Sequence, residues 1–169
     1  MRVINRKLGF SLMEVIVIIF IITMGLIGVA SLVIQNIQVK DFNCDVLVAS
    51  QLAQEGLELV RSVRDSNWLA SEWFGNGLVA EGGTSIITIY FDGSYIVVNP
   101  VVNIDSDEAK LKKNNNFFVH GTGDNTSYSR VIEIDNTDST GIAISSLVQW
   151  NNRGKTHQYR ADTILYDWR

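Results

Sequence analysis

The sequence has only one proline, only one cysteine, and a long stretch with no charged residue. Pro100 is the single proline, so proline cannot bend or end a helix in the first 99 residues. Cys44 stands alone, which excludes an internal disulfide and is more typical of a small apolar helix residue than of a reactive thiol. No Asp, Glu, Lys or Arg occurs between Glu14 and Lys40. The sequence therefore combines an apolar N-terminal region with a polar remainder.

Charge is unevenly divided along the chain. The first nine residues hold Arg2, Arg6 and Lys7 out of 14 basic residues, and none of the 18 acidic ones. The rest of the chain has net charge −7, which argues against nucleic-acid binding, since that needs a basic surface to neutralise phosphates. A local basic cluster is formed by Lys110, Lys112 and Lys113. A solubilising surface is favoured over a DNA contact there.

Residues 15–34 form an uninterrupted apolar run. As a helix, these twenty residues span about 30 Å, the thickness of the hydrocarbon core of a bilayer. Apolar residues cover all sides, as in a helix surrounded by lipid or protein. The basic residues in front of the run keep that end cytoplasmic under the positive-inside rule. A cleaved secretory signal is the competing interpretation, but its apolar region is shorter.

Glu14 distinguishes this run from an ordinary signal anchor. A carboxylate near the start of a membrane segment is costly unless it is paired or reaches the interface. The residues from Lys7 to Val15 read KLGFSLMEV. This stretch resembles the prepilin motif of the type IV pilin family, in which a basic leader ends in Gly and is followed by an aromatic residue, with Glu four positions further on.

The resemblance implies a processing and assembly pathway. A prepilin peptidase in the membrane would remove leader residues 1–9 by cutting between Gly9 and Phe10, and the new amine of Phe10 would be N-methylated. Glu14 would then pair with the Phe10 amine of a neighbouring subunit, because opposite charges attract strongly in a low-dielectric bundle. The implied partners are other pilin subunits, the peptidase and N-methylase, and the inner-membrane assembly platform.

The helix is predicted to continue beyond the apolar run. Residues 10–34 form its transmembrane and assembly half, and residues 35–65 form an amphipathic half, together roughly 80 Å long. Its expected core face contains Val39, Phe42, Val46, Ala49, Ala53, Val60 and Val63. The turn around Gly56 and Leu57 is less regular. Glu58 and Arg61 are spaced to pair across one turn.

Two glycines, Gly25 and Gly28, lie in the apolar half. Close helix packing and a soft point in a filament both account for them. The family often has a proline in this half, and the present sequence has none there, so a kink is not expected.

Residues 66–169 are predicted to form a globular sheet domain. Residues 66–83 read as a connecting loop, whose tryptophans are expected to cover the core or contact other subunits. Asp92-Gly93 between two β-rich segments indicates a two-residue hairpin. The remaining predictions are a polar loop or short helix at 103–116, short strands at 117–119 and 128–134, a turn at 135–141, and a hairpin of 142–150 with 157–166 around residues 151–154. The expected fold is α+β and pilin-like, with the long helix packed on an antiparallel sheet of four to six strands.

Two further stretches resemble a particular branch of the family. Residues 51–61 with 64–68, and the ending Leu165-Tyr166-Asp167-Trp168, are similar to minor pilins of the V type and to I-type pseudopilins. This similarity implies a minor subunit of the filament.

No motif for enzymatic chemistry appears in the sequence. There is no Gly-rich phosphate loop, no G-x-S-x-G and no sign of a Cys–His pairing. His120 and His157 lack metal-ligand spacing and are predicted to be surface residues. Loop acids that could ligate calcium are Asp105, Asp107, Glu108, Asp124 and Asp138. Some pseudopilins hold calcium near the C-terminus, but solvated loop acids are favoured here, so we expect no enzyme, no cofactor and no metal.

The sequence thus predicts a structural subunit, of the minor type, of a type IV pilus or of a type II secretion-like pseudopilus. Before assembly it would cross the inner membrane once, with its N-terminus cytoplasmic; afterwards it would lie in the extracytoplasmic filament. One alternative is a pilin-type binding module for adhesion or DNA uptake, which requires an exposed aromatic or basic site. Another is a membrane-anchored enzyme, which requires convergent polar residues in a pocket.

Overall fold

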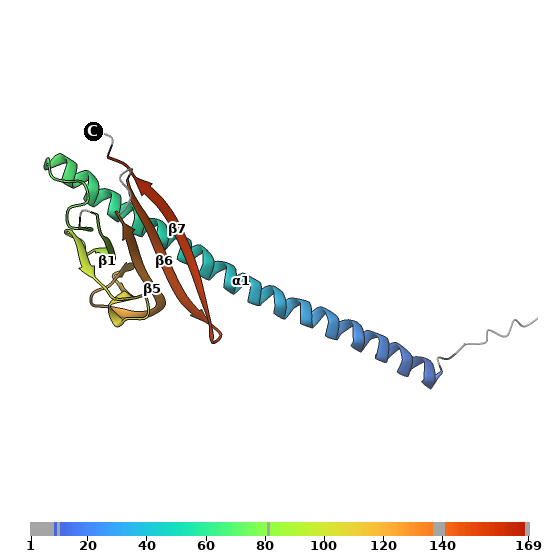
Figure 1. Cartoon of the computed structure of the whole chain (residues 1–169). Coiled ribbons are helices and arrows are strands. Elements are labelled where there is room, and N and C mark those ends of the chain that lie inside the picture. The colour runs from blue at the N-terminus through green and yellow to red at the C-terminus, as the bar shows by residue number, and fades with distance from the viewer. Residues whose placement is uncertain (1–8, 10, 81, 137–140, 168–169) are drawn as a thin grey trace, which may run out of the picture. The chain divides into compact units, whose positions relative to one another are not determined.

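One long helix precedes an antiparallel sheet, and this is an α+β fold as predicted (Figure 1). The computed structural model describes residues 9, 11–80, 82–136 and 141–167. The elements in chain order are α1 (Leu12–Leu69), β1 (Thr84–Phe91), β2 (Ile96–Pro100), the 3₁₀ turn η1 (Asp107–Ala109), β3 (Lys110–Asn114), β4 (Phe117–Val119), β5 (Asp124–Asp135), β6 (Ile142–Asn152) and β7 (Lys155–Leu165). The seven strands exceed the predicted four to six.

Contacts divide the chain into two units, residues 1–43 and residues 44–169. In the second unit, one face of α1 is buried by Ala49, Leu52, Ala53, Gly56, Leu57 and Val60. Their three- and four-residue spacing is that of a helix with a single buried face. Val39 and Phe42 were assigned to this face, but they are 56% and 38% exposed. That assignment is wrong, because this face of α1 first becomes partly buried at Asp45 and Val46 and is fully buried from Ala49.

Helix α1 ends four residues later than expected, in a left-handed turn. Ser71 has φ 58°, and its N–H donates to the carbonyl of Trp68 at 3.1 Å. The N–H of Glu72 donates to the carbonyl of Asn67 at 2.9 Å. This pair of bonds is a Schellman motif, which usually has glycine at the left-handed position. Serine there explains why the sequence did not mark the helix end at Leu69.

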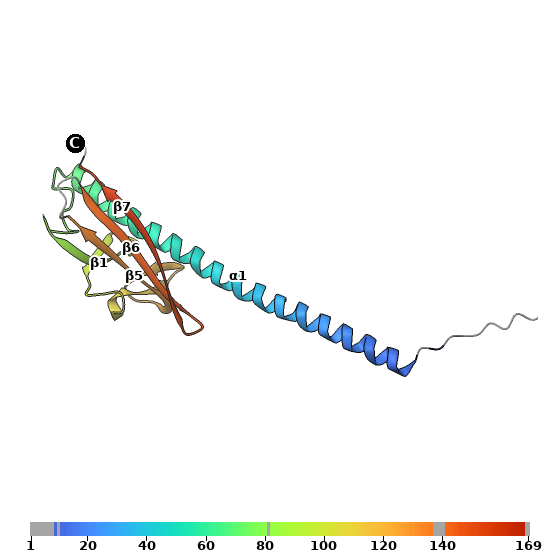
Figure 2. The same cartoon turned by 45° about the vertical axis from the view of Figure 1, so that its right-hand side comes forward.

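Strand β5 is the centre of the sheet. One of its edges pairs with β6 from Tyr128 to Asp135, and β6 pairs in turn with β7. The other edge pairs with β1 at its C-terminal end and with β3 at its N-terminal end. In both views β5, β6 and β7 lie side by side (Figures 1 and 2). The polar segment predicted as a loop contains η1 and β3, because β3 gains backbone partners on β4 and β5.

Both predicted hairpins form, with different turns. Strands β1 and β2 pair up to Phe91 and Ile96, so residues 92–95 connect them instead of two residues. The carboxylate of Asp92 accepts hydrogen bonds from the N–H groups of Ser94 and Tyr95, and these bonds close the turn. Strands β6 and β7 pair up to Asn152 and Lys155. Their turn is therefore two residues, Arg153 and Gly154, with φ 53° and 77°, as the twist of a tight hairpin requires.

Two buried clusters hold α1 against the sheet. The larger contains Leu57 and Val60 of the helix together with apolar residues of β1, β5 and β6, and Trp68 and Trp73 pack against it. The tryptophans therefore cover the core, as predicted. The smaller contains Ala49, Leu52 and Ala53 with Leu111, Tyr128, Val148 and Trp150. Each helix residue reaches a sheet residue far along the sequence, so the two clusters fold as one unit with this part of α1.

Candidate functional site

The first part of α1 presents an apolar surface on every side. From Leu12 to Val39, each Val, Ile, Leu, Phe and Met side chain is at least 42% exposed. No charged residue interrupts the surface after Glu14. By length and composition alone, this helix could cross a membrane. The apolar run 15–34 corresponds to about 30 Å, the thickness of a hydrocarbon core, and the exposed side chains of Ile37 and Val39 lie beyond it among polar residues.

Glu14 lies in the first turn of α1. The N–H groups of Glu14 and Val15 donate to the carbonyl of Ser11 at 3.0 and 3.2 Å, and these bonds start the helix. The carboxylate is exposed and stands near the positive end of the helix dipole, where a negative charge is favoured. Gly9 is exposed and has open space around its Cα. Arg2, Arg6, Lys7 and Phe10 lie outside the described residues, so the predicted cleavage junction is described only on its Gly9 side.

The polar hydroxyls in the apolar stretch bond within the helix. The Thr23 hydroxyl donates to the carbonyl of Phe20 at 2.9 Å, and the Ser31 hydroxyl donates to that of Ile27 at 3.0 Å. Their hydrogen-bonding needs are thus met without water, which suits an apolar surrounding. A Cβ at Gly25 or Gly28 would meet no atom within 4 Å. Neither glycine is packed in the single chain.

Asp45 joins α1 to the sheet near the start of the second unit. Its carboxylate accepts a hydrogen bond from the Tyr128 hydroxyl at 3.1 Å and another from the Asn152 side-chain amide at 2.5 Å. Burial, together with the hydrogen bond to Asp45, raises the pKa of Tyr128 to about 12. The phenol therefore stays protonated and donates at all ordinary pH values. These contacts connect the helix both to β5 and to the turn between β6 and β7.

Arg130 is a fully buried cation between helix and sheet, and sequence reasoning missed it. Its Nη1 donates to the carbonyl of Leu52 at 2.8 Å and its Nη2 to that of Ile89 at 2.7 Å. The nearest carboxylate oxygen, on the partly exposed Glu55, is 3.6 Å from Nη1. Burial lowers the pKa of the Arg130 guanidinium, and the Glu55 charge partly offsets this. Alternation along β5 could have revealed it, since Arg130 falls between the inward-facing Tyr128 and Ile132.

His120 is half-buried, with its Nε2 enclosed, so it is not the freely exposed surface residue that was predicted. Its Nδ1 lies 3.1 Å from the carbonyl of Glu108, and its ring centroid is 5.9 Å from that of Tyr90. Its Nε2 is buried and has no hydrogen-bond partner among the described residues. Burial, followed by the nearby Arg130 charge, lowers the pKa of His120 to about 3. The imidazole is therefore neutral, with Nδ1 donating to the carbonyl.

His157 also departs from the predicted surface position. It is half-buried, and its ring stacks on Trp150 with centroids 5.6 Å apart. Each histidine is thus half-buried against its own aromatic neighbour, Tyr90 or Trp150.

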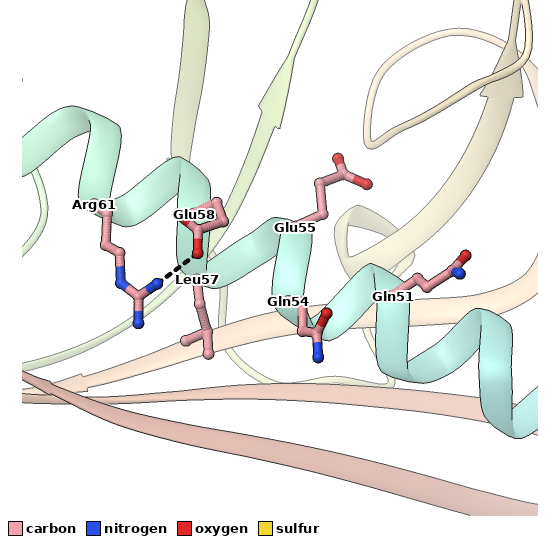
Figure 3. A pocket seen from close by; sticks show the side chains of 6 residues that line it. All are labelled: Gln51, Gln54, Glu55, Leu57, Glu58 and Arg61. Carbon is pink, nitrogen blue, oxygen red and sulfur yellow. Dashed lines mark hydrogen bonds and ion pairs between the residues drawn. The ribbon is translucent and has the colours of Figure 1, made fainter.

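An open hollow runs along the solvent-facing side of α1 (Figure 3). It is lined by Gln51, Gln54, Glu55, Leu57, Glu58 and Arg61. Arg61 and Glu58 form the predicted ion pair across one turn, at 2.5 Å. Glu55 leaves the helix on the opposite side from Gln54 and Leu57 (Figure 3). All six lining residues come from α1 alone, and Leu57 belongs to its buried face, so the hollow brings together no groups from different elements.

Two of the acidic residues predicted as loop acids make contacts with different partners. Asp105 accepts a hydrogen bond from Gln149 at 2.8 Å, and Asp107 pairs with Lys110 at 2.6 Å. Asp124 begins β5, and Asp138 lies outside the described residues. Within the part of the chain that the structure describes, no three His, Cys, Asp or Glu side chains are arranged to hold a metal ion.

The predicted basic cluster lies on a strand, and the single cysteine lies on the helix. Lys110, Lys112 and Lys113 lie on β3 instead of a loop, and Lys112 is half-buried. Cys44 is exposed on α1. Neither feature gathers further functional groups around it. Comparison with protein families, with curated proteins and with solved structures found no match to the chain.

Proposed function

We propose that this protein is a structural subunit of a type IV pilus or of a type II secretion-like pseudopilus. In this proposal, the segment before Phe10 is removed by a prepilin peptidase, and α1 then carries the subunit from the inner membrane into the filament. The sheet domain faces outward and performs no chemistry. The chain is itself the substrate of the peptidase and the N-methylase.

The exposed apolar surface of α1 is the observation that carries the proposal. Ile37 and Val39 follow the membrane-length run and are 54% and 56% exposed. In a simple anchor that ends its span at Ile34, these side chains would face water at a cost. A bundle of neighbouring helices would cover them, as well as the side chains that lipid covers before assembly.

Glu14 supports filament assembly over simple anchoring. A carboxylate in the first turn of an apolar helix is costly in a bilayer. Its pairing with the N-methylated amine of Phe10 on a neighbour would offset that cost and would fix the axial offset between two helices. The motif KLGFSLMEV provides this amine and this carboxylate at the spacing of prepilins.

The resemblance of residues 51–61, 64–68 and 165–168 to V-type minor pilins and I-type pseudopilins favours a minor subunit. Such a subunit would act with other pilins and with the inner-membrane assembly platform, in small numbers per filament. This finer assignment depends on sequence resemblance, whereas the assembly role also has the support of the apolar surface.

The proposal is tested by the fate of Glu14→Ala in cells that make the filament. We expect normal membrane insertion and leader removal, with the variant lost from sheared, purified filaments. Glu108→Ala is the matched control, because it removes an exposed acid from η1 and should leave incorporation unchanged. Intact mass of the wild-type protein should correspond to a chain that starts at methylated Phe10. Wild-type levels of Glu14→Ala in filaments, or a mature chain that starts at Met1, would contradict the proposal.

A further inference from the structure

We infer that Gly56 and Arg130 together fix the axial register of α1 on the sheet. The inference concerns residues 44–169 and holds whether or not the chain enters a filament. It assigns to the buried cation a role in selecting one packing arrangement, distinct from a role in raising stability.

Gly56 lies close against the sheet. A Cβ on this residue would lie 2.7 Å from Cδ1 of Ile132 and 2.9 Å from Oγ of Ser146. Real Cβ atoms do not approach other atoms so closely, so any other amino acid here requires these side-chain ends or the helix to shift. The same Cβ would be 3.4 Å from Cδ of Arg130. The glycine thus lies directly over the side chain of the buried arginine.

Arg130 binds the helix one turn before that glycine. Its Nη1 donates to the carbonyl of Leu52, four residues before Gly56, and its Nη2 donates to the carbonyl of Ile89 on β1. The carbonyl of Leu52 has a second lone pair for the bond within the helix. The planar guanidinium therefore spans the gap between α1 and β1 with both bonds at good length.

The two residues contribute different parts of the register. A backbone carbonyl recurs at each helical position, so the arginine alone would accept the helix after a shift of one turn. The buried face also offers small side chains at other positions, and Ala53 lies three residues before Gly56 on that face. A shift that brought Ala53 over Arg130 would place a Cβ where none fits. The glycine selects the turn only while Arg130 fills the space beneath the helix, because the side-chain ends of Ile132 and Ser146 can move to accept a Cβ once that space is freed.

The cost of burying Arg130 supports a role in specificity. Its side chain has no exposed surface, and its Nε has no hydrogen-bond partner among the described residues. Replacing a buried ionic group by an apolar one is often neutral or stabilising, whereas such groups can fix register. Packed helices can shift by one turn between discrete arrangements. Without the arginine, the apolar interface of this helix would accept more than one such position.

The test measures the register directly by electron–electron distance spectroscopy in the detergent-solubilised full chain. Cys44→Ser removes the only native thiol. Spin labels are then attached to cysteines introduced at Ser62 on α1 and Thr156 on β7, both exposed. Asn152, next to the β6–β7 turn, contacts Asp45, and Ser62 lies about 25 Å further along the helix. Axial movement of α1 therefore changes the distance between the labels.

The labelled parent should give one narrow distance. Arg130→Met should add a second population displaced by about 5 Å, one helical turn, while its unfolding midpoint stays equal or rises. A single unchanged distance in a folded Arg130→Met variant would overturn the inference. If the arginine only stabilised the fold, its loss would lower the stability but leave the helix in the original register.

A glycine-exchange variant keeps the test decisive if Arg130→Met does not fold. Ala53→Gly combined with Gly56→Ala moves the glycine three residues toward the N-terminus and retains Arg130. The label distance should then increase by about 4.5 Å, because the helix must advance for the new glycine to lie over the arginine. Ala53→Gly alone is the matched control and should keep the parental distance. A parental distance in the exchange variant would overturn the inference.

Discussion

The hydroxyl of Tyr128 donates to the carboxylate of Asp45 at 3.1 Å, across 83 residues of sequence. This bond ties β5 to α1 where the buried part of the helix begins. Tyr128→Phe keeps the ring and removes only the donor, so we expect a loss of about 1–2 kcal/mol in the free energy of unfolding. Urea denaturation measures this loss. Tyr166→Phe, at a half-exposed tyrosine after β7, is the control and should change little; equal losses in the two variants would contradict the prediction.

The same tyrosine predicts a change of stability at high pH. Its pKa is raised to about 12 in the folded protein, against about 10 for an unfolded tyrosine. The resulting stabilisation is present in full below pH 10 and is lost as the pH rises from 10 to 12. Tyr128→Phe should reduce this alkaline loss, as followed by the urea midpoint at several pH values. An identical alkaline loss in the variant would show that other groups cause it.

His120 predicts the opposite dependence in acid. Its pKa falls to about 3 on folding, from a usual value near 6.5. As the pH falls, His120 therefore becomes protonated in the unfolded chain before it does so in the folded protein. The stabilisation that comes from keeping this imidazole neutral is complete above pH 6.5 and declines as the pH falls toward 3. The slope from this residue is at most about 1.4 kcal/mol per pH unit. His120→Gln should flatten the dependence between pH 6.5 and 5, where few carboxylates titrate. A slope equal to that of the wild type would contradict the burial of this imidazole.

Gly56→Ala tests the close approach of α1 by stability alone. The added Cβ meets Ile132 and Ser146 at distances that require movement, so we expect a loss of about 1–3 kcal/mol in the free energy of unfolding. Gly28→Ala is the matched control, since its Cβ meets no atom within 4 Å. That change should leave the unfolding of the sheet domain unaffected. Thermal unfolding followed by near-UV circular dichroism compares the two, and equal midpoints would refute the contact.

The coarse fold could be predicted from the sequence, because long periodic patterns carry it. The charge-free run after Glu14 indicates a helix without ambiguity, and Gly154 with strong strand patterns on both sides indicates a hairpin. Turn lengths were missed because they depend on local bonds, such as those of the Asp92 carboxylate to two following N–H groups. The late end of α1 was missed because Ser71, and not glycine, takes the left-handed position.

The polar interior was harder to predict, for a different physical reason. A charged residue in a strand is normally assigned to the solvent side. Only tertiary contacts can offset the desolvation cost of burying the Arg130 guanidinium. Those contacts are the carbonyls of Leu52 and Ile89, which no side-chain pattern can reveal. Likewise, His120 is partly buried by packing around the end of β4, although the residues that follow it, 121–127, carry no apolar side chain. Glu14, by contrast, could be singled out from the sequence, because its position relative to Gly9 is a local feature, and its role stays a prediction.

The separation of Leu52 and Arg130 also has a consequence during synthesis. The two residues are 78 positions apart, and the buried face of α1 meets only strands that follow it. At a translation rate of about 5–20 residues per second, Arg130 is synthesised roughly 4 to 16 seconds after Leu52. Strands β6 and β7 follow still later. The nascent chain therefore emerges with its apolar helix complete and its sheet absent, so that a holding factor or the membrane itself must protect the helix until the last hairpin closes.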